Sequence, residues 1–387
     1  MVHGETTTRS PLLDADHLLS RLRERGVAQL RDERAIWVIL DGSDLRKPHA
    51  REMGGLQRVK RLQGGGMVPG YRTINAIGVG VERRGLLYHH LFSSTADDFV
   101  SESVETQRAL AATGAALAPL GAEVTYILDA GFDDIAVWDT IWIQEAHVVV
   151  RVRDRTRLVH LTAAAPACHL HECARGLRPL AQVETEMVVR KTGQPREKLQ
   201  PVTAVVAAVP MLLRYQHAAR MIAPGEWRER ALWLVEVRLE HVGSEAWWLI
   251  TDRPVETAEE ATELFRMYRQ RWAIEDAFKV GKQCLGWEDV QVLDFDAVRV
   301  LVALGWVAAG FLYELGVTLE WEEVRLLRRL GGGEERANRS PGKIVLTRGL
   351  RRLLDVFATE AILAAHIKEY GALPPRLAAV LGRPVTG

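Results

Sequence analysis

Short runs of apolar residues, rather than long alternating ones, mark the strands in the first part of this chain. The runs Ile36–Asp41 and Glu123–Asp129 are largely apolar, and each of them ends on a carboxylate. Strands buried on both faces of a parallel or mixed sheet have this composition. Tyr71–Val81 and Gly85–Phe92 have the pattern of two paired strands, and His147–Val152 that of another. We therefore predict a buried sheet.

Apolar residues at helical spacing lie between these runs. They predict helices at residues 18–30, 97–117 and 135–142. Ser94 and Thr95 are candidate N-caps for the second helix, and Asp133 and Asp134 for the third.

Two polar or glycine-rich segments predict connections. Gly42–Pro48 follows the first carboxylate and predicts a turn. Gln63–Tyr71 is rich in glycine but lacks the strand-to-helix context of a nucleotide loop, so a hairpin connection is the better interpretation. The resulting order is strand, strand, strand, helix, strand, helix, strand, which is the order of a ribonuclease H-like sheet.

The second half of the chain changes from β to helical patterns. Between residues 153 and 252 most signals are β, whereas 258–285 and Ala297–Leu315 predict helices, and two or three more helices are expected before Ala379. The expected division is a short N-terminal segment (1–33), a core (34–152 and 253–320), a β-rich insertion (153–252) and a helical C-terminal region (321–387).

Composition narrows the function classes. The 387 residues carry 50 basic and 50 acidic side chains, so the net charge is zero and a generally basic nucleic-acid binder is excluded. Contacts to nucleic acid would have to come from local basic clusters. Three cysteines, no apolar N-terminal leader and no long uninterrupted apolar stretch predict a cytoplasmic protein without a membrane segment. The basic clusters are Arg46–Arg61, Arg151–Arg157, Arg325–Arg329 and Arg348–Arg352.

One polar stripe distinguishes the predicted helix at 258–285. Its members are Tyr268, Arg271, Glu275, Lys279 and Lys282, at offsets 0, 3, 7, 11 and 14. At about 100° per residue, these positions lie within about 80° of each other on a helix. A single carboxylate beside cations and a tyrosine suits a metal-binding Glu next to groups that hold a phosphate backbone. The alternative is a solvated helix with surface salt bridges. Apolar residues interleaved with the stripe predict the face toward a core, namely Phe265, Trp272, Ile274, Ala277 and Phe278.

The stripe resembles a known signature. Its spacing, with the pairs Arg271-Trp272 and Ile274-Glu275, is similar to that of the DDE transposases of bacterial insertion sequences, specifically the insertion-sequence-4 group. Trp247–Glu256 resembles the strand and turn that precede the signature helix in that family, and the resemblance covers about residues 36–320. It implies an α/β fold: a ribonuclease H-like mixed sheet flanked by helices, with a β-rich insertion and a helical C-terminal region.

The resemblance also implies a metal site. Asp41, Asp129 and Glu275 would be the catalytic carboxylates and would bind two Mg²⁺ or Mn²⁺ ions. Asp44 is the rival of Asp41 for the first position, and Asp133 that of Asp129. We favour Asp41 because the apolar strand leads directly into it.

The remaining signature residues are expected to contact DNA. Arg271 and Lys282 would grip phosphates beside the scissile bond, Lys279 would be a second phosphate contact, and Tyr268 would hydrogen-bond a phosphate. In the family, a base is flipped out and stacked on an aromatic residue, and Trp247 stands at the matching place. Its alternative role is that of a core tryptophan beside Trp248.

The expected function is cut-and-paste transposition of an insertion sequence, by strand cleavage, hairpin formation and strand transfer. The expected partners are double-stranded DNA, as element ends and as target, and a second copy of the chain in a homodimer. Relatives carry a longer N-terminal region that recognises terminal repeats, whereas 40 residues precede Asp41, so we expect a reduced region here. The rival hypotheses are a catalytically silent DNA-binding remnant and a nuclease that cuts without joining.

Overall fold

The two compact units of the chain are formed by residues 1–279 with 286–310, and by residues 280–285 with 311–387. The computed structural model describes residues 14–62, 64–81, 83–189, 198–216, 227–240, 245–333 and 342–372.

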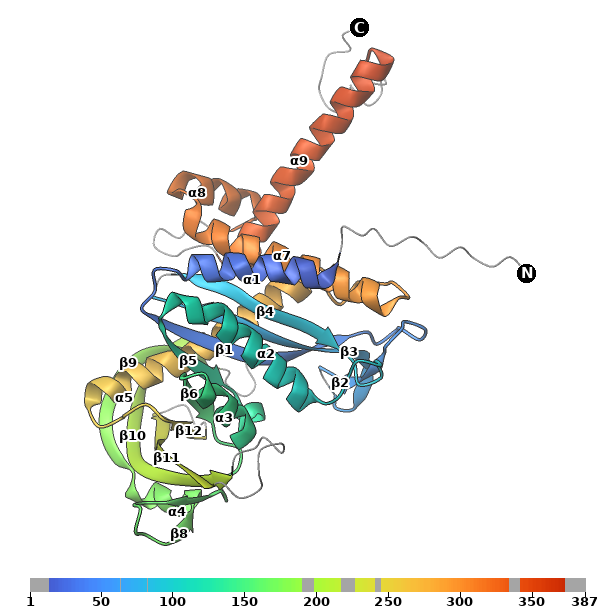
Figure 1. Cartoon of the computed structure of the whole chain (residues 1–387). Coiled ribbons are helices and arrows are strands. Elements are labelled where there is room, and N and C mark those ends of the chain that lie inside the picture. The colour runs from blue at the N-terminus through green and yellow to red at the C-terminus, as the bar shows by residue number, and fades with distance from the viewer. Residues whose placement is uncertain are drawn as a thin grey trace. The chain divides into compact units, whose positions relative to one another are not determined.

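The first unit is built on one large mixed sheet (Figure 1). Its strands are β1 (Ala35–Arg46), β2 (Gln57–Lys60), β3 (Met67–Val79), β4 (Arg84–Phe92), β5 (Glu123–Leu128), β6 (His147–Arg151), β7 (Leu158–His160), β8 (Ala167–His169), β9 (Arg178–Val189), β10 (Lys198–Gln216), β11 (Trp227–Leu239) and β12 (Trp247–Thr251).

Parallel pairing defines the centre of this sheet. β1 pairs in parallel with β5, and β5 with β6, whereas β3 is antiparallel to β1. Within the described residues, the order is β2-β3-β1-β5-β6-β12-β11-β10-β7-β8, with β4 beside β3 and β9 beside β10. The strands of the predicted insertion therefore continue the same sheet through β12.

Helices flank the sheet. Those of the first unit are α1 (Ala15–Gln29), α2 (Glu102–Leu117), α3 (Ile135–Ile143), α4 (Leu170–Cys173), α5 (Ala258–Arg269) and α6 (Ala273–Lys279), together with the first part of α7 (Phe295–Thr318). α1 packs on β4, and α2 packs on β3 and β4 (Figure 1). Fully buried side chains of the core include Leu40, Tyr126 and Trp138.

Helix α7 is the most apolar of the long helices named so far. Among the described residues, it is the helix whose length and composition would allow it to cross a membrane. Val298, Val302 and Trp306 on it are nevertheless fully buried inside the protein, which is the behaviour of a core helix.

The second unit is helical. It contains α8 (Trp321–Leu330), α9 (Lys343–Tyr370), the end of α7 and the π-helical segment Val280–Cys284. Two glycines let the helices approach closely, because a Cβ on Gly349 of α9 would lie 2.0 Å from the carbonyl oxygen of Leu327, and a Cβ on Gly331 would lie 2.1 Å from that of Val345. The predicted helices beyond residue 372 lie outside the described residues.

The structure confirms the predicted fold class: a mixed α/β sheet flanked by helices, with a helical C-terminal region. The predicted domain boundaries at residues 33, 152, 252 and 320 stay predictions.

Three local predictions are wrong. The turn at Gly42–Pro48 is a strand as far as Arg46, because β3 is long enough to pair with it from Gly42↔Ile74 to Arg46↔Gly70. α2 begins at Glu102, and its N-cap is Ser101, whose hydroxyl accepts a hydrogen bond from Val104 N–H. The backbone N–H groups of Ser94 and Thr95 instead donate hydrogen bonds to Gln57 Oε1 and to Ser93 Oγ.

The predicted helix at 258–285 is not one continuous α-helix. A 3₁₀ turn, Gln270–Trp272, separates α5 from α6, and a π-helical segment follows α6. Angles computed for a uniform helix therefore do not hold over the whole signature.

Candidate functional site

Two of the predicted carboxylates lie next to each other because of strand register. Leu40 of β1 is the parallel partner of Leu128 of β5, and each of these residues is followed directly by an aspartate, Asp41 and Asp129. Carboxyl ends of neighbouring parallel strands open onto a common crevice, where ligands bind in α/β proteins. Asp41 remains within β1, and its carbonyl oxygen accepts a hydrogen bond from the side-chain amide of Asn75 on β3, whereas Asp129 begins the 3₁₀ turn Ala130–Phe132.

Arg271 brings the third carboxylate to this crevice. α6 packs against β1, and the guanidinium of Arg271 lies 3.4 Å from Asp41 Oδ2 and 3.2 Å from Glu275 Oε1. The Arg271 side chain is only 10% exposed. A buried cation therefore bridges a strand carboxylate and a helix carboxylate that are far apart in the sequence.

The electrostatics of the site reflect this convergence. Burial raises the pKa of Asp41 to about 6, against the opposing charge of Arg271, and the charges of Asp129 and Glu275 raise it too. Burial alone would lower the pKa of Arg271, but the surrounding carboxylates, Asp129 foremost, raise it above its usual range. Three carboxylates thus act on one another and on one guanidinium.

A buried network of polar side chains hydrogen-bonds the backbone of Asp41. Asn75 of β3 is the register partner of Asp41, is fully buried, and donates to the Asp41 carbonyl oxygen at 3.3 Å and to Thr73 Oγ1 at 3.0 Å. His89 Nδ1 lies 2.7 Å from Asn75 Oδ1, and burial lowers the pKa of His89 well below its usual value, so the neutral ring donates. These hydrogen bonds are not among the contacts predicted from the sequence. Their only signal is polar residues inside a buried strand.

The crevice forms a pocket of about 690 Å³. Asp41, Asp44, Asp129 and Asp134 line it together with basic residues of β1, β2 and β3. Asp44 lies 3.7 Å from Arg72 across the sheet, so the rival carboxylate has a different cation as partner.

The two aspartates after Asp129 have different structural roles. Asp134 caps α3 through Ala136 N–H, as predicted. The cap prediction for Asp133 is wrong: its buried carboxylate pairs with Arg157 at 2.6 Å and accepts the backbone N–H groups of Arg153 and Asp154. Asp133 therefore fixes the loop after β6 to the loop after β5.

Tyr268 and Trp247 lie side by side. The Tyr268 ring is 3% exposed, its centroid is 5.8 Å from that of Trp247, and Trp247 also stacks on Phe265 at 6.5 Å. The Tyr268 hydroxyl is buried and finds no hydrogen-bond partner among the described residues. Trp248, next to Trp247 in the sequence, packs against the core and donates to Glu236.

The remaining stripe residues and Trp272 lie in different surroundings. Lys279 is more than half exposed, and its ammonium lies 3.9 Å from Asp276. Lys282 lies in the π-helical segment, which belongs to the second unit. Trp272 was predicted to face the core, but it is 50% exposed and lies under the Arg271 guanidinium, because the 3₁₀ turn rotates it outward.

The chemistry of the donor set fits divalent metal ions. Asp41, Asp129 and Glu275 offer hard carboxylate oxygens from three separate elements, which Mg²⁺ and Mn²⁺ prefer. The guanidinium of Arg271 pairs with two of these carboxylates, Asp41 and Glu275, and so places a positive charge where a bound metal ion would place one. Within the described ranges, however, no three His, Cys, Asp or Glu side chains are arranged closely enough to hold an ion.

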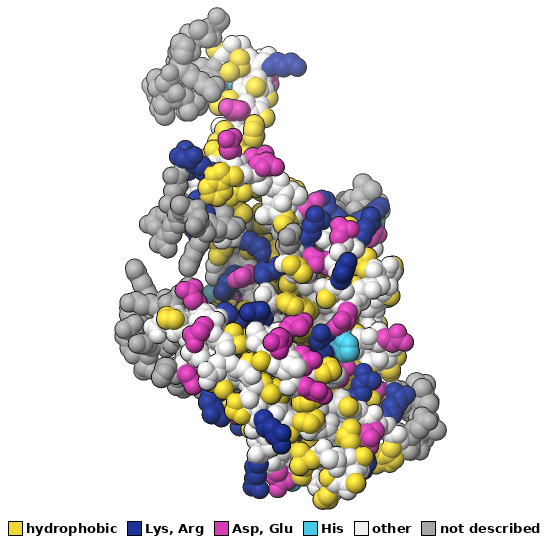
Figure 2. Space-filling model, turned by 90° about the vertical axis from the view of Figure 1, so that its left-hand side faces the viewer, with side chains coloured by type: hydrophobic (Ala, Val, Ile, Leu, Met, Phe, Trp, Pro, Cys, Tyr) yellow, Lys and Arg dark blue, Asp and Glu magenta, His cyan; other side chains and the backbone are white. Residues whose placement is uncertain are grey.

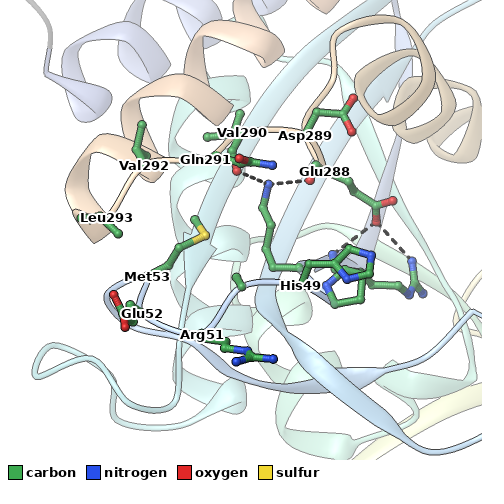
Figure 3. A pocket seen from close by; sticks show the side chains of 14 residues that line it. His49, Arg51, Glu52, Met53, Glu288, Asp289, Val290, Gln291, Val292 and Leu293 are labelled. Carbon is green, nitrogen blue, oxygen red and sulfur yellow. Dashed lines mark hydrogen bonds and ion pairs between the residues drawn. The ribbon is translucent and has the colours of Figure 1, made fainter.

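A second cavity of about 880 Å³ lies between the segments 46–53 and 288–293 (Figure 3). Lys47 lines this cavity, and its ammonium donates to the carbonyl oxygens of Trp287, Glu288 and Val290 at 2.6–3.1 Å. Burial lowers the pKa of Lys47 to about 8. Because three carbonyl oxygens accept hydrogen bonds from its ammonium, Lys47 links the two segments.

Comparison with protein families identifies a domain in this chain. The family model described as the transposase DDE domain matches residues 37–309, which is more than half of the 387 residues and includes all three carboxylates. No curated protein matches the chain.

Proposed function

The chain belongs to the transposase DDE domain family, and from this premise we propose that it moves an insertion sequence of the insertion-sequence-4 group by cutting DNA and joining the cut end to a target. As a member of this family, it is a transposase that acts on DNA. Cut-and-paste transposition in the bacterial cytoplasm, at the nucleoid, is the specific form that we propose.

Three carboxylates would hold the metal ions. Asp41 lies within β1 beside the end of β5, which Asp129 follows, so the two share the crevice, and Glu275 reaches it from α6. Two bound Mg²⁺ or Mn²⁺ ions would polarise the attacking and the leaving oxygens of the phosphodiester.

The contact of Arg271 with both Asp41 and Glu275 carries this proposal. It joins the two ends of the catalytic core across 230 residues of sequence. Arg271 neutralises the carboxylates in the absence of other cations, and its fork of donors suits a phosphate oxygen equally well. Its role is to grip a phosphate beside the scissile bond once cations occupy the carboxylates.

Other signature residues would orient the DNA. The buried hydroxyl of Tyr268 lacks a protein partner and would donate to a backbone phosphate. Lys279 and Lys282 would add phosphate contacts, which position DNA without reading its sequence. Trp247, which stacks on Phe265 and lies beside Tyr268, would receive a flipped base while a hairpin end forms.

Cleavage and joining of a precut DNA end test the proposal. The substrate is a linear duplex end with the sequence that flanks the gene, pre-nicked or precut, in Mg²⁺ or Mn²⁺. We expect hairpin and joined products from the wild type, and a loss of at least about 10³-fold with Glu275→Gln or Asp129→Asn, as for removal of charge-stabilising groups. Asp276→Asn is the matched control, because Asp276 neighbours Glu275 but is 58% exposed and its ion pair among the described residues is a long one, 3.9 Å to Lys279.

The outcomes separate the rival functions. Cleavage without joined products would indicate a nuclease. DNA binding without any product, in wild type and variants alike, would leave a DNA-binding remnant and contradict the proposal.

A further inference from the structure

The edge strand β2 presents cations on one face. Its residues alternate between buried and exposed, so Gln57 and Val59 point inward while Arg58 and Lys60 are exposed side by side. Arg61 continues this exposed row into the turn. Three cations within four positions thus lie at one edge of the sheet. Figure 1 shows this edge strand, labelled β2.

Two of these three cations line the pocket of the carboxylates. Arg58 and Lys60 line the same cavity of about 690 Å³ as Asp41 and Asp129. The pocket is therefore acidic at Asp41 within β1 and at Asp129 after β5, and basic along β2. A polyanion that reached the carboxylates alone would be repelled, whereas one that lay along β2 would be attracted.

The β2 cations differ from the other cations of this pocket in their partners. Arg46 pairs with Glu288 at 3.5 Å, and Arg72 pairs with Asp44 and Glu102. In the part of the chain that the structure describes, no carboxylate lies within ion-pair distance of Arg58, Lys60 or Arg61, which together form the β2 cation row. Arg58 donates to the Met67 carbonyl oxygen, at 3.1 Å.

The turn after β2 leaves room for a large ligand. Gly64, Gly65 and Gly66 all have positive φ, and no atom lies within 4 Å of the positions where their Cβ atoms would stand. A turn without side chains lets another backbone approach closely. Leu62 beside it is 75% exposed.

We propose that the β2 cation row binds the phosphate backbone of the DNA duplex on one side of the cleavage point. This inference rests on the proposed function, since it places DNA in the carboxylate pocket. Each of the three side chains neutralises one phosphate, and together they set the direction in which the duplex leaves the pocket. The contacts are independent of base sequence.

Salt dependence of DNA binding tests the proposal. The full chain, in EDTA, is titrated into a fluorescent duplex between 50 and 200 mM salt. The triple variant Arg58→Gln/Lys60→Gln/Arg61→Gln should flatten the slope of log K against log salt by about 2 to 3, since each phosphate contact contributes about 0.9. The conservative variant Arg58→Lys/Lys60→Arg/Arg61→Lys should keep the wild-type slope.

Three other exposed arginines give the matched control. Arg31, Arg34 and Arg83 lie near the opposite end of β1 and β3 from the pocket, and they are exposed as the β2 cations are. Their replacement by Gln removes the same charge and should change the slope by less than about 1. An equal loss in both triple variants would mean a general charge effect and would overturn the inference.

The cleavage assay keeps the two proposals apart. A wild type that cleaves and joins DNA, with an unchanged slope in the β2 variant, would overturn the inference and leave the proposed function standing. A flattened slope in a protein that gives no product would support the β2 contact and contradict the proposed function. Wild-type binding to an RNA duplex but not to DNA would overturn both.

Discussion

The charge of Asp41 is unfavourable in the metal-free protein. Its side chain is 19% exposed and lies near two other carboxylates, and the Arg271 guanidinium compensates only in part. Functional sites often hold groups that lower stability, because the arrangement that binds a ligand is not the one that stabilises the free protein.

Removal of this charge should stabilise the metal-free protein at neutral pH. The folded pKa of Asp41, about 6, lies above the ordinary value of 3.8, so its favourable contribution is complete below pH 3.8 and is lost as the pH rises through 6. Asp41→Asn should therefore raise the free energy of unfolding by on the order of 2 kcal/mol at pH 7.5, with a gain that vanishes near pH 4. Urea unfolding in EDTA at several pH values measures this.

Asp276→Asn serves as the control, because its exposed carboxylate should give no such pH-dependent gain. A wild type more stable than Asp41→Asn at pH 7.5 would contradict the electrostatic account and would mean that the pair with Arg271 outweighs burial.

Among the elements, the contact of α1 with β4 depends on two glycines. A Cβ on Gly26 would lie 2.2 Å from the carbonyl oxygen of Leu86, and a Cβ on Gly85 would lie 2.2 Å from that of Gly26. Backbone therefore packs directly on backbone, and α1 covers this part of the sheet at a distance that only glycine allows.

Gly26→Ala should separate α1 from β4. We expect a loss of about 1–3 kcal/mol in the free energy of unfolding, as for overpacked cores. Gly131→Ala is the control, since no atom lies within 4 Å of its Cβ position, and it should change stability by less than about 0.5 kcal/mol. Equal urea midpoints for the two variants would show that the α1 contact tolerates a methyl group.

For the whole molecule, the net charge of zero does not describe the local distribution of basic and acidic side chains. The face in Figure 2 carries basic and acidic side chains interspersed, in keeping with 50 residues of each sign. Association with DNA therefore depends on particular rows of cations rather than on the overall field.

Self-association is expected to involve α9. Exposed apolar side chains lie along this helix, among them Leu354, Phe357 and Ile362 at 58%, 60% and 70% exposure. Along α9, Arg348, Arg351 and Arg352 precede Asp355, Glu360 and Glu369, so two copies in antiparallel orientation would pair opposite charges.

Phe357→Glu/Ile362→Glu should shift the protein from dimer to monomer in sedimentation velocity, because it places charge in the apolar face. Leu158→Glu, at a similarly exposed apolar position in the first unit, should leave the dimer intact. A wild type that sediments as a monomer at all concentrations would contradict this prediction.

The sequence by itself determined the elements and the family. Apolar runs that end on Asp41 and Asp129 identify buried strands, and the spacing from Tyr268 to Lys282 identifies the signature, because burial of one segment and the pattern of one motif are local properties. The fold class and the transposase domain follow from these local patterns, and both are confirmed.

Only the tertiary structure decided which groups meet. Strand β1 continues to Arg46 because β3 pairs with it, Trp272 faces outward because a 3₁₀ turn interrupts the helix, and Asp133 pairs with Arg157 rather than capping α3. The contact between Arg271 and Asp41 spans 230 residues, and the Asn75 network depends on strand register. Such contacts depend on how distant segments pack, which the periodicity of a single segment does not encode.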